Sequence, residues 1–178
     1  MVNEIRDECL ITEGIRSYEI LQQKNGGREV FLKGNFCVSE KSNYPVISVF
    51  QEDTGIYVWE NMKPKLLPGQ SWEIKLWLAA GHMYRIETGI CLQCTGYDCR
   101  FLGRGTIVRE VGVGEIFVIA GQSNAAGYGH QSIMDRPHPM VHMKNTDGSW
   151  EMAAHHLAHV DPPQITEHMD VFNAGHSA

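Results

Sequence analysis

Between residues 28 and 112, apolar and polar residues alternate in short runs, and this pattern constrains the fold more than any other feature of the sequence. Successive side chains of a strand point to opposite faces, so period-two alternation predicts half-buried strands. In residues 72–78 the even positions are apolar and stand opposite Glu73 and Lys75, with Trp77 as the exception. The predicted strands are Glu29–Ser39, Tyr44–Phe50, Gly55–Glu60, Trp72–Leu78, Met83–Leu92 and Gly105–Val111.

Turn residues separate these runs, for example Asn25-Gly26-Gly27 and Pro68-Gly69. They supply the positive or fixed φ angles that tight turns require. The regular strand spacing predicts an N-terminal antiparallel β-sandwich over residues 1–112. We expect Trp72 to pack in its core, whereas Trp59 and Trp77 would stack on sugar rings only if they shared one face of the sandwich.

The pattern changes after Gly112-Val113-Gly114, because Ile116–Ala120 is a continuous apolar run. Such a run predicts a strand buried on both faces, as in a parallel sheet that helices cover. We therefore place a domain boundary near residue 112 and predict that residues 113–178 form the start of an α/β domain. Beyond Gly129 we expect long loops, with one short helix around Met152–Ala158.

Composition excludes several classes of function. The net charge of −6 gives no basic surface for nucleic acid or anionic lipid, so a neutral partner is expected. The start of the chain, Met1–Asp7, has no signal-peptide pattern, and no stretch approaches the ~18 apolar residues of a membrane helix. As written, the chain is predicted to be cytoplasmic, and an extracellular location would follow if an export signal had been trimmed. The oligomeric state is left open.

Cysteine and histidine patterns raise the question of a metal. The five cysteines are an odd number, and reduced thiols are expected for Cys9, Cys37, Cys91, Cys94 and Cys99. The Cys91–Cys94 spacing suits zinc, with His82 as a further ligand, but free or buried thiols are the favoured interpretation. On a helix, His155 and His159 would share a face, yet no acidic general base stands between them. No metal and no organic cofactor is predicted.

Ser123 is the strongest candidate for chemistry. It follows the apolar run within Gly121-Gln122-Ser123-Asn124 and is flanked by small residues, which let an ester carbonyl approach. Backbone N–H groups of this turn could stabilise an oxyanion, an effect of about 3 kcal/mol per donor. The α/β-hydrolase elbow needs a glycine where Ala125 stands, so a different family is indicated. The alternative role for Ser123 is a helix N-cap.

The block Gly121–Asn124, with Ala-Ala-Gly after it, resembles the first conserved block of the sialate O-acetylesterase branch of the SGNH hydrolases. Three weaker matches follow, at Asp147–Trp150, Asp161–Pro163 and Gly175–Ser177. Together they cover roughly residues 113–178. The resemblance implies a flavodoxin-like three-layer fold for this part, and some members carry a β-sandwich ahead of it, which would account for residues 1–112.

The resemblance implies that Ser123 attacks an acetyl ester on a carbohydrate, with its own amide, a later glycine and a later asparagine in the oxyanion hole. Gly121, Gln122 and Asn124 would shape the turn. The base would be a histidine of a late Asp-x-x-His block, which is not found, so we interpret the chain as a fragment. One Asp-x-x-His pattern exists at Asp135–His138, and it gives His138 with Asp135 as a weaker candidate for the base.

Two hypotheses therefore remain. In the first, the protein is a serine esterase that removes O-acetyl groups from carbohydrates through an acyl-enzyme. In the second, it is a non-catalytic carbohydrate-binding or interaction module whose esterase portion is a remnant. The presence of a base near Ser123 would distinguish them.

Overall fold

The computed structural model describes residues 7–92, 101–119, 136–145 and 147–154. The chain divides into two compact units, residues 1–115 and residues 116–178. The described residues form strands and contain no helix. The strands are β1 (Glu8–Glu13), β2 (Ile20–Gln22), β3 (Gly27–Cys37), β4 (Asn43–Gln51), β5 (Ile56–Met62), β6 (Lys65–Leu67), β7 (Ser71–Ala79), β8 (His82–Leu92), β9 (Phe101–Gly114), β10 (His142–Lys144) and β11 (Trp150–Met152).

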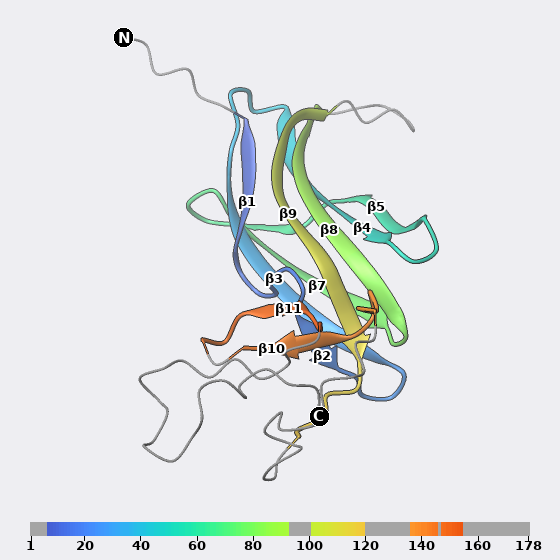
Figure 1. The fold of residues 1–178 in the computed structure, drawn as a ribbon. Helices are drawn as coiled ribbons and strands as arrows, with labels where there is room; N and C mark the ends of the chain where they lie inside the picture. Colours follow the sequence, from blue (N-terminus) through green and yellow to red (C-terminus); the bar gives the residue numbers. More distant parts are fainter. Residues whose placement is uncertain (1–6, 93–100, 120–135, 146, 155–178) are drawn as a thin grey trace. The chain divides into compact units, whose positions relative to one another are not determined.

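The first unit is a β-sandwich of two sheets (Figure 1). The four-stranded sheet has the order β1-β3-β7-β6, and the five-stranded sheet has the order β2-β9-β8-β4-β5. Neighbouring strands are antiparallel except for β2 and β9, which are parallel. The six predicted strands are confirmed as β3, β4, β5, β7, β8 and β9. The predicted boundary at residue 112 falls inside β9, which continues to Gly114.

Alternating side chains of both sheets meet in one core. In β7, Trp72, Ile74, Leu76 and Leu78 are buried as predicted, while Trp77 is 49% exposed. Side chains from the five-stranded sheet complete this cluster, among them Ile47, Val49, Tyr84, Ile86, Ile90 and Val111. Burying one such side chain contributes about 1.5 to 3 kcal/mol, so the core stabilises the pairing of the two sheets.

Strand β1 connects the two sheets at one side of the sandwich. It pairs with β3, and its backbone also bonds to side chains of the opposite sheet. The Thr88 hydroxyl donates to the Cys9 carbonyl oxygen at 2.5 Å, and the Ile11 amide donates to the Thr106 hydroxyl oxygen at 3.0 Å. A Cβ at Gly105 would overlap the Cys9 carbonyl, so only glycine permits this approach.

We predict that Gly105→Ala destabilises the sandwich by at least about 3 kcal/mol, because backbone atoms must move to admit the methyl group. Gly114→Ala in the same strand is the matched control, since nothing lies within 4 Å of its Cβ position. It should change stability by less than about 1 kcal/mol. Chemical denaturation of both variants tests this, and similar midpoints for the two would contradict the close approach.

The second unit contributes one hairpin among its described residues. β10 and β11 pair antiparallel, with a turn in which the Asp147 Oδ1 accepts the Ser149 amide at 2.8 Å. The predicted helix around Met152–Ala158 is wrong at Met152, which ends β11; residues 155–158 lie outside the described residues. Asp and Gly in a short connection favour a hairpin turn, and this local signal prevailed.

The predicted buried strand at Ile116–Ala120 is also wrong for residues 116–119, which form no strand. Phe117, Val118 and Ile119 are 82%, 88% and 68% exposed. An apolar run becomes a buried strand only where neighbouring strands and helices cover it. The described part of residues 116–178 supplies a two-stranded hairpin and no helix, so it shows no α/β layer.

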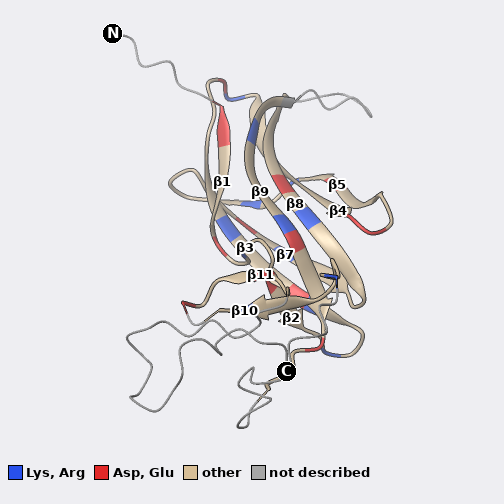
Figure 2. Cartoon of the chain, viewed as in Figure 1, with Lys and Arg blue, Asp and Glu red and all other residues tan. Residues whose placement is uncertain are grey.

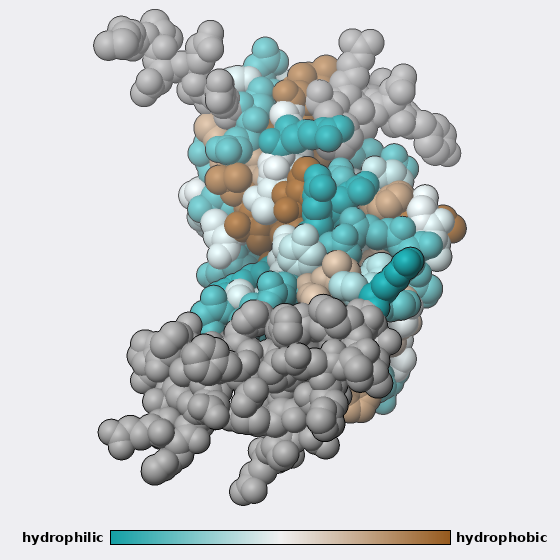
Figure 3. Space-filling model, in the orientation of Figure 1, coloured by the Kyte–Doolittle hydropathy of each residue, from teal (hydrophilic) through white to brown (hydrophobic). Residues whose placement is uncertain are grey.

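Charge and hydropathy are mixed over the surface of the sandwich. Figure 2 shows basic and acidic residues interspersed along β8 and β9. On the side seen in Figure 3, apolar and hydrophilic side chains are likewise interspersed. Within the described ranges, no helix is long and apolar enough to cross a membrane.

Candidate functional site

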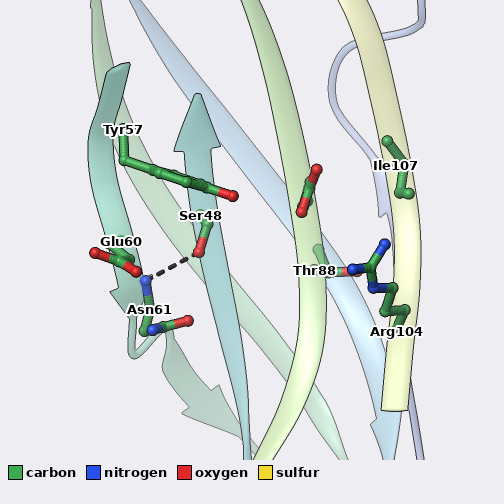
Figure 4. Close-up of a pocket in the computed structure, with 8 residues that line it drawn as sticks. Ser48, Tyr57, Glu60, Asn61, Thr88, Arg104 and Ile107 are labelled. Atoms are coloured by element: carbon green, nitrogen blue, oxygen red, sulfur yellow. Dashed lines mark hydrogen bonds between the residues drawn. The ribbon is translucent and has the colours of Figure 1, made fainter. Parts of the chain in front are cut away.

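A polar pocket opens on the outer face of the five-stranded sheet (Figure 4). It has a volume of about 120 Å³. The residues that line it come from β4, β5, β8 and β9: Ser48, Tyr57, Glu60, Asn61, Glu87, Thr88, Arg104 and Ile107. In Figure 4, Tyr57 reaches inward from β5 and the Arg104 guanidinium turns inward from β9, so the two side chains border the pocket from opposite sides.

The register of the sheet explains why polar side chains gather there. Ser48 is opposite Glu87, and Glu87 is opposite Ile107, so one row of the outer face crosses β4, β8 and β9. Successive side chains of a strand point to opposite faces of the sheet. The neighbouring side chains, which include Ile47 and Ile86, therefore face the core. Next to this row, Gly89 lies between Val46 and Arg104 in the register and carries no side chain to fill the surface.

Irregularities in the edge strand β5 turn further side chains toward the pocket. The pairs Ile47–Met62 and Val49–Trp59 leave both Glu60 and Asn61 opposite Ser48. A second shift follows between Val49 and Phe50, which faces Tyr57. Bulges of this kind re-aim side chains. Because Val49 is a core residue and Phe50 is not, Tyr57 joins the outer face, whereas Trp59 stands opposite a core-facing position.

A chain of contacts fixes two walls of the pocket. The Tyr57 ring stands edge-on to the Phe50 ring, with centroids 5.0 Å apart. The Arg85 guanidinium lies over Phe50 at 4.4 Å from the ring centroid, and its Nε lies 2.6 Å from the Glu87 carboxylate. Aromatic and cation–π contacts of this kind are each worth about 0.5 to 1.5 kcal/mol. Tyr57 and Glu87 are therefore held in place before any ligand arrives.

Asn61 combines a left-handed backbone with a buried side-chain oxygen that has no hydrogen-bond partner among the described residues. Its backbone is in the left-handed region, with φ of 50°, and its amide donates to the Ser48 hydroxyl oxygen at 2.9 Å. Its side-chain Oδ1 is buried and accepts no hydrogen bond from the described residues. A buried acceptor without a donor costs about 1 to 3 kcal/mol, so this oxygen is an unsatisfied group in a residue that lines the pocket.

We predict that Ser48→Ala costs about 1 to 2 kcal/mol, because it leaves the Asn61 amide without its acceptor at a strained backbone position. Ser42→Ala is the matched control, since the Ser42 hydroxyl makes only an exposed bond of 3.4 Å to Glu40. That change should cost less than about 0.5 kcal/mol. Urea denaturation measures both values, and equal effects would show that the Ser48 bond does not support the pocket.

An Asp–His pair forms a second titratable cluster in the sandwich. The His82 Nδ1 lies 2.7 Å from the Asp53 Oδ2, and the Asp53 Oδ1 accepts the Met83 amide at 3.2 Å. Burial alone would raise the pKa of Asp53, but the bonds from His82 and Met83 outweigh it and lower the pKa. Through these two bonds, Asp53 connects the turn before β5 to β8.

Because the pKa of Asp53 is lowered by folding, its ionised form stabilises the protein above the ordinary value of 3.8, and this stabilisation is lost as the pH falls through the folded pKa. We predict that Asp53→Asn loses about 0.2 to 1 kcal/mol near neutral pH. The loss should shrink as the solution becomes more acidic than the lowered pKa. Denaturation at several pH values tests this, and a difference that does not vary with pH would contradict it.

The residues predicted for catalysis lie mostly outside the described residues, namely Gly121, Gln122, Ser123, Asn124 and Asp135. His138 is described and is exposed beside the turn at Pro139 and Met140. Its Nδ1 accepts the Met140 amide at 3.2 Å. A triad histidine uses Nδ1–H as a donor to its aspartate. In this conformation the His138 Nδ1 is an acceptor, so it has no proton to donate to an aspartate.

The prediction of reduced thiols is confirmed for Cys9 and Cys37 and needs correction at Cys91. Cys91 is disulfide-bonded, whereas Cys9 and Cys37 carry free thiols. An odd number of cysteines prevents all five from pairing but permits one pair, so the prediction of reduced thiols is wrong for Cys91. Burial raises the pKa of Cys9 to about 11, which makes its thiol inert.

Trp59 and Trp77 lie in different sheets, so they share no sugar-stacking face.

The described part of the chain contains no cluster of side chains suited to a metal ion. No group of three or more His, Cys, Asp or Glu side chains that could hold a metal occurs among residues 7–92, 101–119, 136–145 and 147–154. His155, His159, Cys94 and Cys99 lie outside these ranges. In the structure, the His82 Nδ1 is paired with Asp53. Cys91 is in a disulfide, so it has no thiolate to bind a metal.

Comparison with known proteins adds no assignment. The sequence matches no protein-family model, and no curated protein matches it.

The pocket was not predicted from the sequence. Alternation alone places Ser48 and Glu87 on outward positions of two strands, which is a usable signal. It does not give the register that puts them opposite one another. Asn61, which lies in one of the two irregularities of β5, has a left-handed backbone, and no residue pattern predicts this.

Proposed function

We propose that this protein is a serine esterase that removes O-acetyl groups from carbohydrates. The observation that carries the proposal is the block Gly121-Gln122-Ser123-Asn124, which resembles the nucleophile block of sialate O-acetylesterases. The sandwich of the first unit supports it, because some members of that group carry a β-sandwich ahead of the catalytic domain. The same resemblance carries the finer fold proposal of an α/β domain after the sandwich, which would begin beyond β9 rather than at residue 113, because β9 continues to Gly114.

In the proposed reaction, the Ser123 hydroxyl oxygen bonds to the acetyl carbonyl carbon and a base takes the hydroxyl proton. The tetrahedral intermediate then expels the sugar oxygen, which receives that proton and leaves as an alcohol. Water attacks the acetyl-enzyme, acetate leaves, and Ser123 regains its proton. Amides of the turn at Gly121–Asn124 would stabilise the oxyanion in both steps.

This mechanism needs a base, and the structure assigns that role to no described residue. His138 with Asp135 was the candidate within the chain, and the Met140 amide bonded to the His138 Nδ1 does not favour it. Catalysis by His138 would require that bond to break and the ring to present Nδ1–H to a carboxylate.

We predict that Ser123→Ala abolishes hydrolysis of an acetyl ester such as p-nitrophenyl acetate, with a loss of at least about a thousandfold. Ser149→Ala is the matched control, because Ser149 lies in the β10–β11 turn and bonds to Asp147. That variant should keep its activity. Hydrolysis by Ser123→Ala at the rate of the unaltered chain would reject the esterase proposal.

The second candidate is a non-catalytic carbohydrate-binding module in which the sandwich alone acts. The polar pocket at Ser48, Tyr57 and Arg104 favours it, because it presents hydrogen-bonding groups and an aromatic ring on one sheet face. Carbohydrate binding without any Ser123-dependent hydrolysis would support this candidate over the esterase.

A further inference from the structure

We infer that the outer-face pocket of the five-stranded sheet binds one uncharged pyranose unit of a glycan. The choice of a carbohydrate ligand rests on the proposed function, whereas the site itself follows from the geometry. Six side chains would make the contacts: Ser48, Tyr57, Glu60, Asn61, Glu87 and Arg104.

The donors and acceptors of the pocket complement vicinal hydroxyl groups. The carboxylates of Glu60 and Glu87 accept hydrogen bonds, while the Arg104 guanidinium donates them. Each sugar hydroxyl both donates and accepts, so it can bridge an acceptor and a donor of this set. A ligand that only accepts, such as sulfate, would leave the carboxylates of Glu60 and Glu87 without a hydrogen-bond donor.

The charge balance also favours an uncharged ligand. Glu87 is paired with Arg85 at 2.6 Å, which leaves the carboxylate of Glu60 and the guanidinium of Arg104 as opposite charges that border the pocket. Neither of these two takes part in an ion pair among the described residues. An anion would be attracted by Arg104 and repelled by Glu60, so the two charges give the pocket no net preference for an anion, within a chain whose net charge is −6.

The size and walls of the pocket fit a single ring. Its volume of about 120 Å³ is well below the roughly 300 Å³ of pockets that enclose larger organic ligands. Tyr57 is 45% exposed and borders the pocket, so the C–H face of a sugar can pack on its ring. Its contact with Phe50 holds the ring in place, which reduces the entropy that binding must remove.

The test is a titration of the full chain, carrying Ser123→Ala so that no ester is turned over, with uncharged methyl pyranosides of glucose, galactose and mannose. Amide NMR spectra should show saturable shifts for at least one sugar at residues of β4, β5, β8 and β9 around the pocket. Tyr57→Ala should weaken this binding at least about tenfold, and Glu60→Gln should weaken it about threefold to tenfold.

Trp59→Ala is the matched control, because Trp59 lies in the same strand and is 41% exposed but stands opposite the core position Val49. It should bind as the unaltered pocket does. Absence of saturable shifts with all three sugars, shifts located elsewhere, or equal losses in Tyr57→Ala and Trp59→Ala would overturn the assignment. Preferential binding of inorganic phosphate or a sugar acid would also overturn it, since the pocket would then be an anion site.

This titration, read together with the hydrolysis assay of the unaltered chain and Ser123→Ala, separates the failure of the site from the failure of the enzyme. Pocket binding together with Ser123-independent hydrolysis would leave the sugar site standing and reject the esterase. Ser123-dependent hydrolysis without pocket binding would reject the sugar site alone.

Discussion

The sandwich depends on the close approach of β1 to β9, where the Cys9 carbonyl lies against Gly105 and accepts the Thr88 hydroxyl. Through this contact, β1 pairs with one sheet by its backbone and bonds to the other through hydroxyl side chains. Because Thr88 and Glu87 are adjacent in β8, the hydroxyl that bonds inward and the carboxylate that lines the pocket are set by the same segment of strand.

The pocket depends on a different feature, the irregular pairing of the edge strand β5 with β4. β4 is regular along β8, so Ser48 and Glu87 are aligned by ordinary register. β5 is irregular along β4, and its bulges direct Tyr57, Glu60 and Asn61 to one face. Together with β9, which has register shifts of its own along β8, these strands place groups from four strands around one pocket. The same arrangement leaves Trp59 opposite a core position, although it is only two residues from Tyr57.

Sequence reasoning succeeded where local pattern decides structure. The alternation around Trp72 fixed a strand and its buried face correctly, including Trp77 as the outward exception. It failed where the outcome depends on distant partners. Ile116–Ile119 has the composition of a buried strand, yet burial needs neighbours that the described part of its unit does not supply. The disulfide at Cys91 and the left-handed Asn61 depend on backbone positions that no spacing of residues encodes.

The central claim is that Ser123 is an activated nucleophile. Treatment of the chain with a serine-directed fluorophosphonate, followed by peptide mass spectrometry, tests it most directly. The account predicts one phosphonyl adduct, on the peptide that contains Ser123, because only a serine beside a base and an oxyanion site reacts rapidly with such reagents. An unmodified chain, or adducts spread over several surface serines at similar rates, would contradict it.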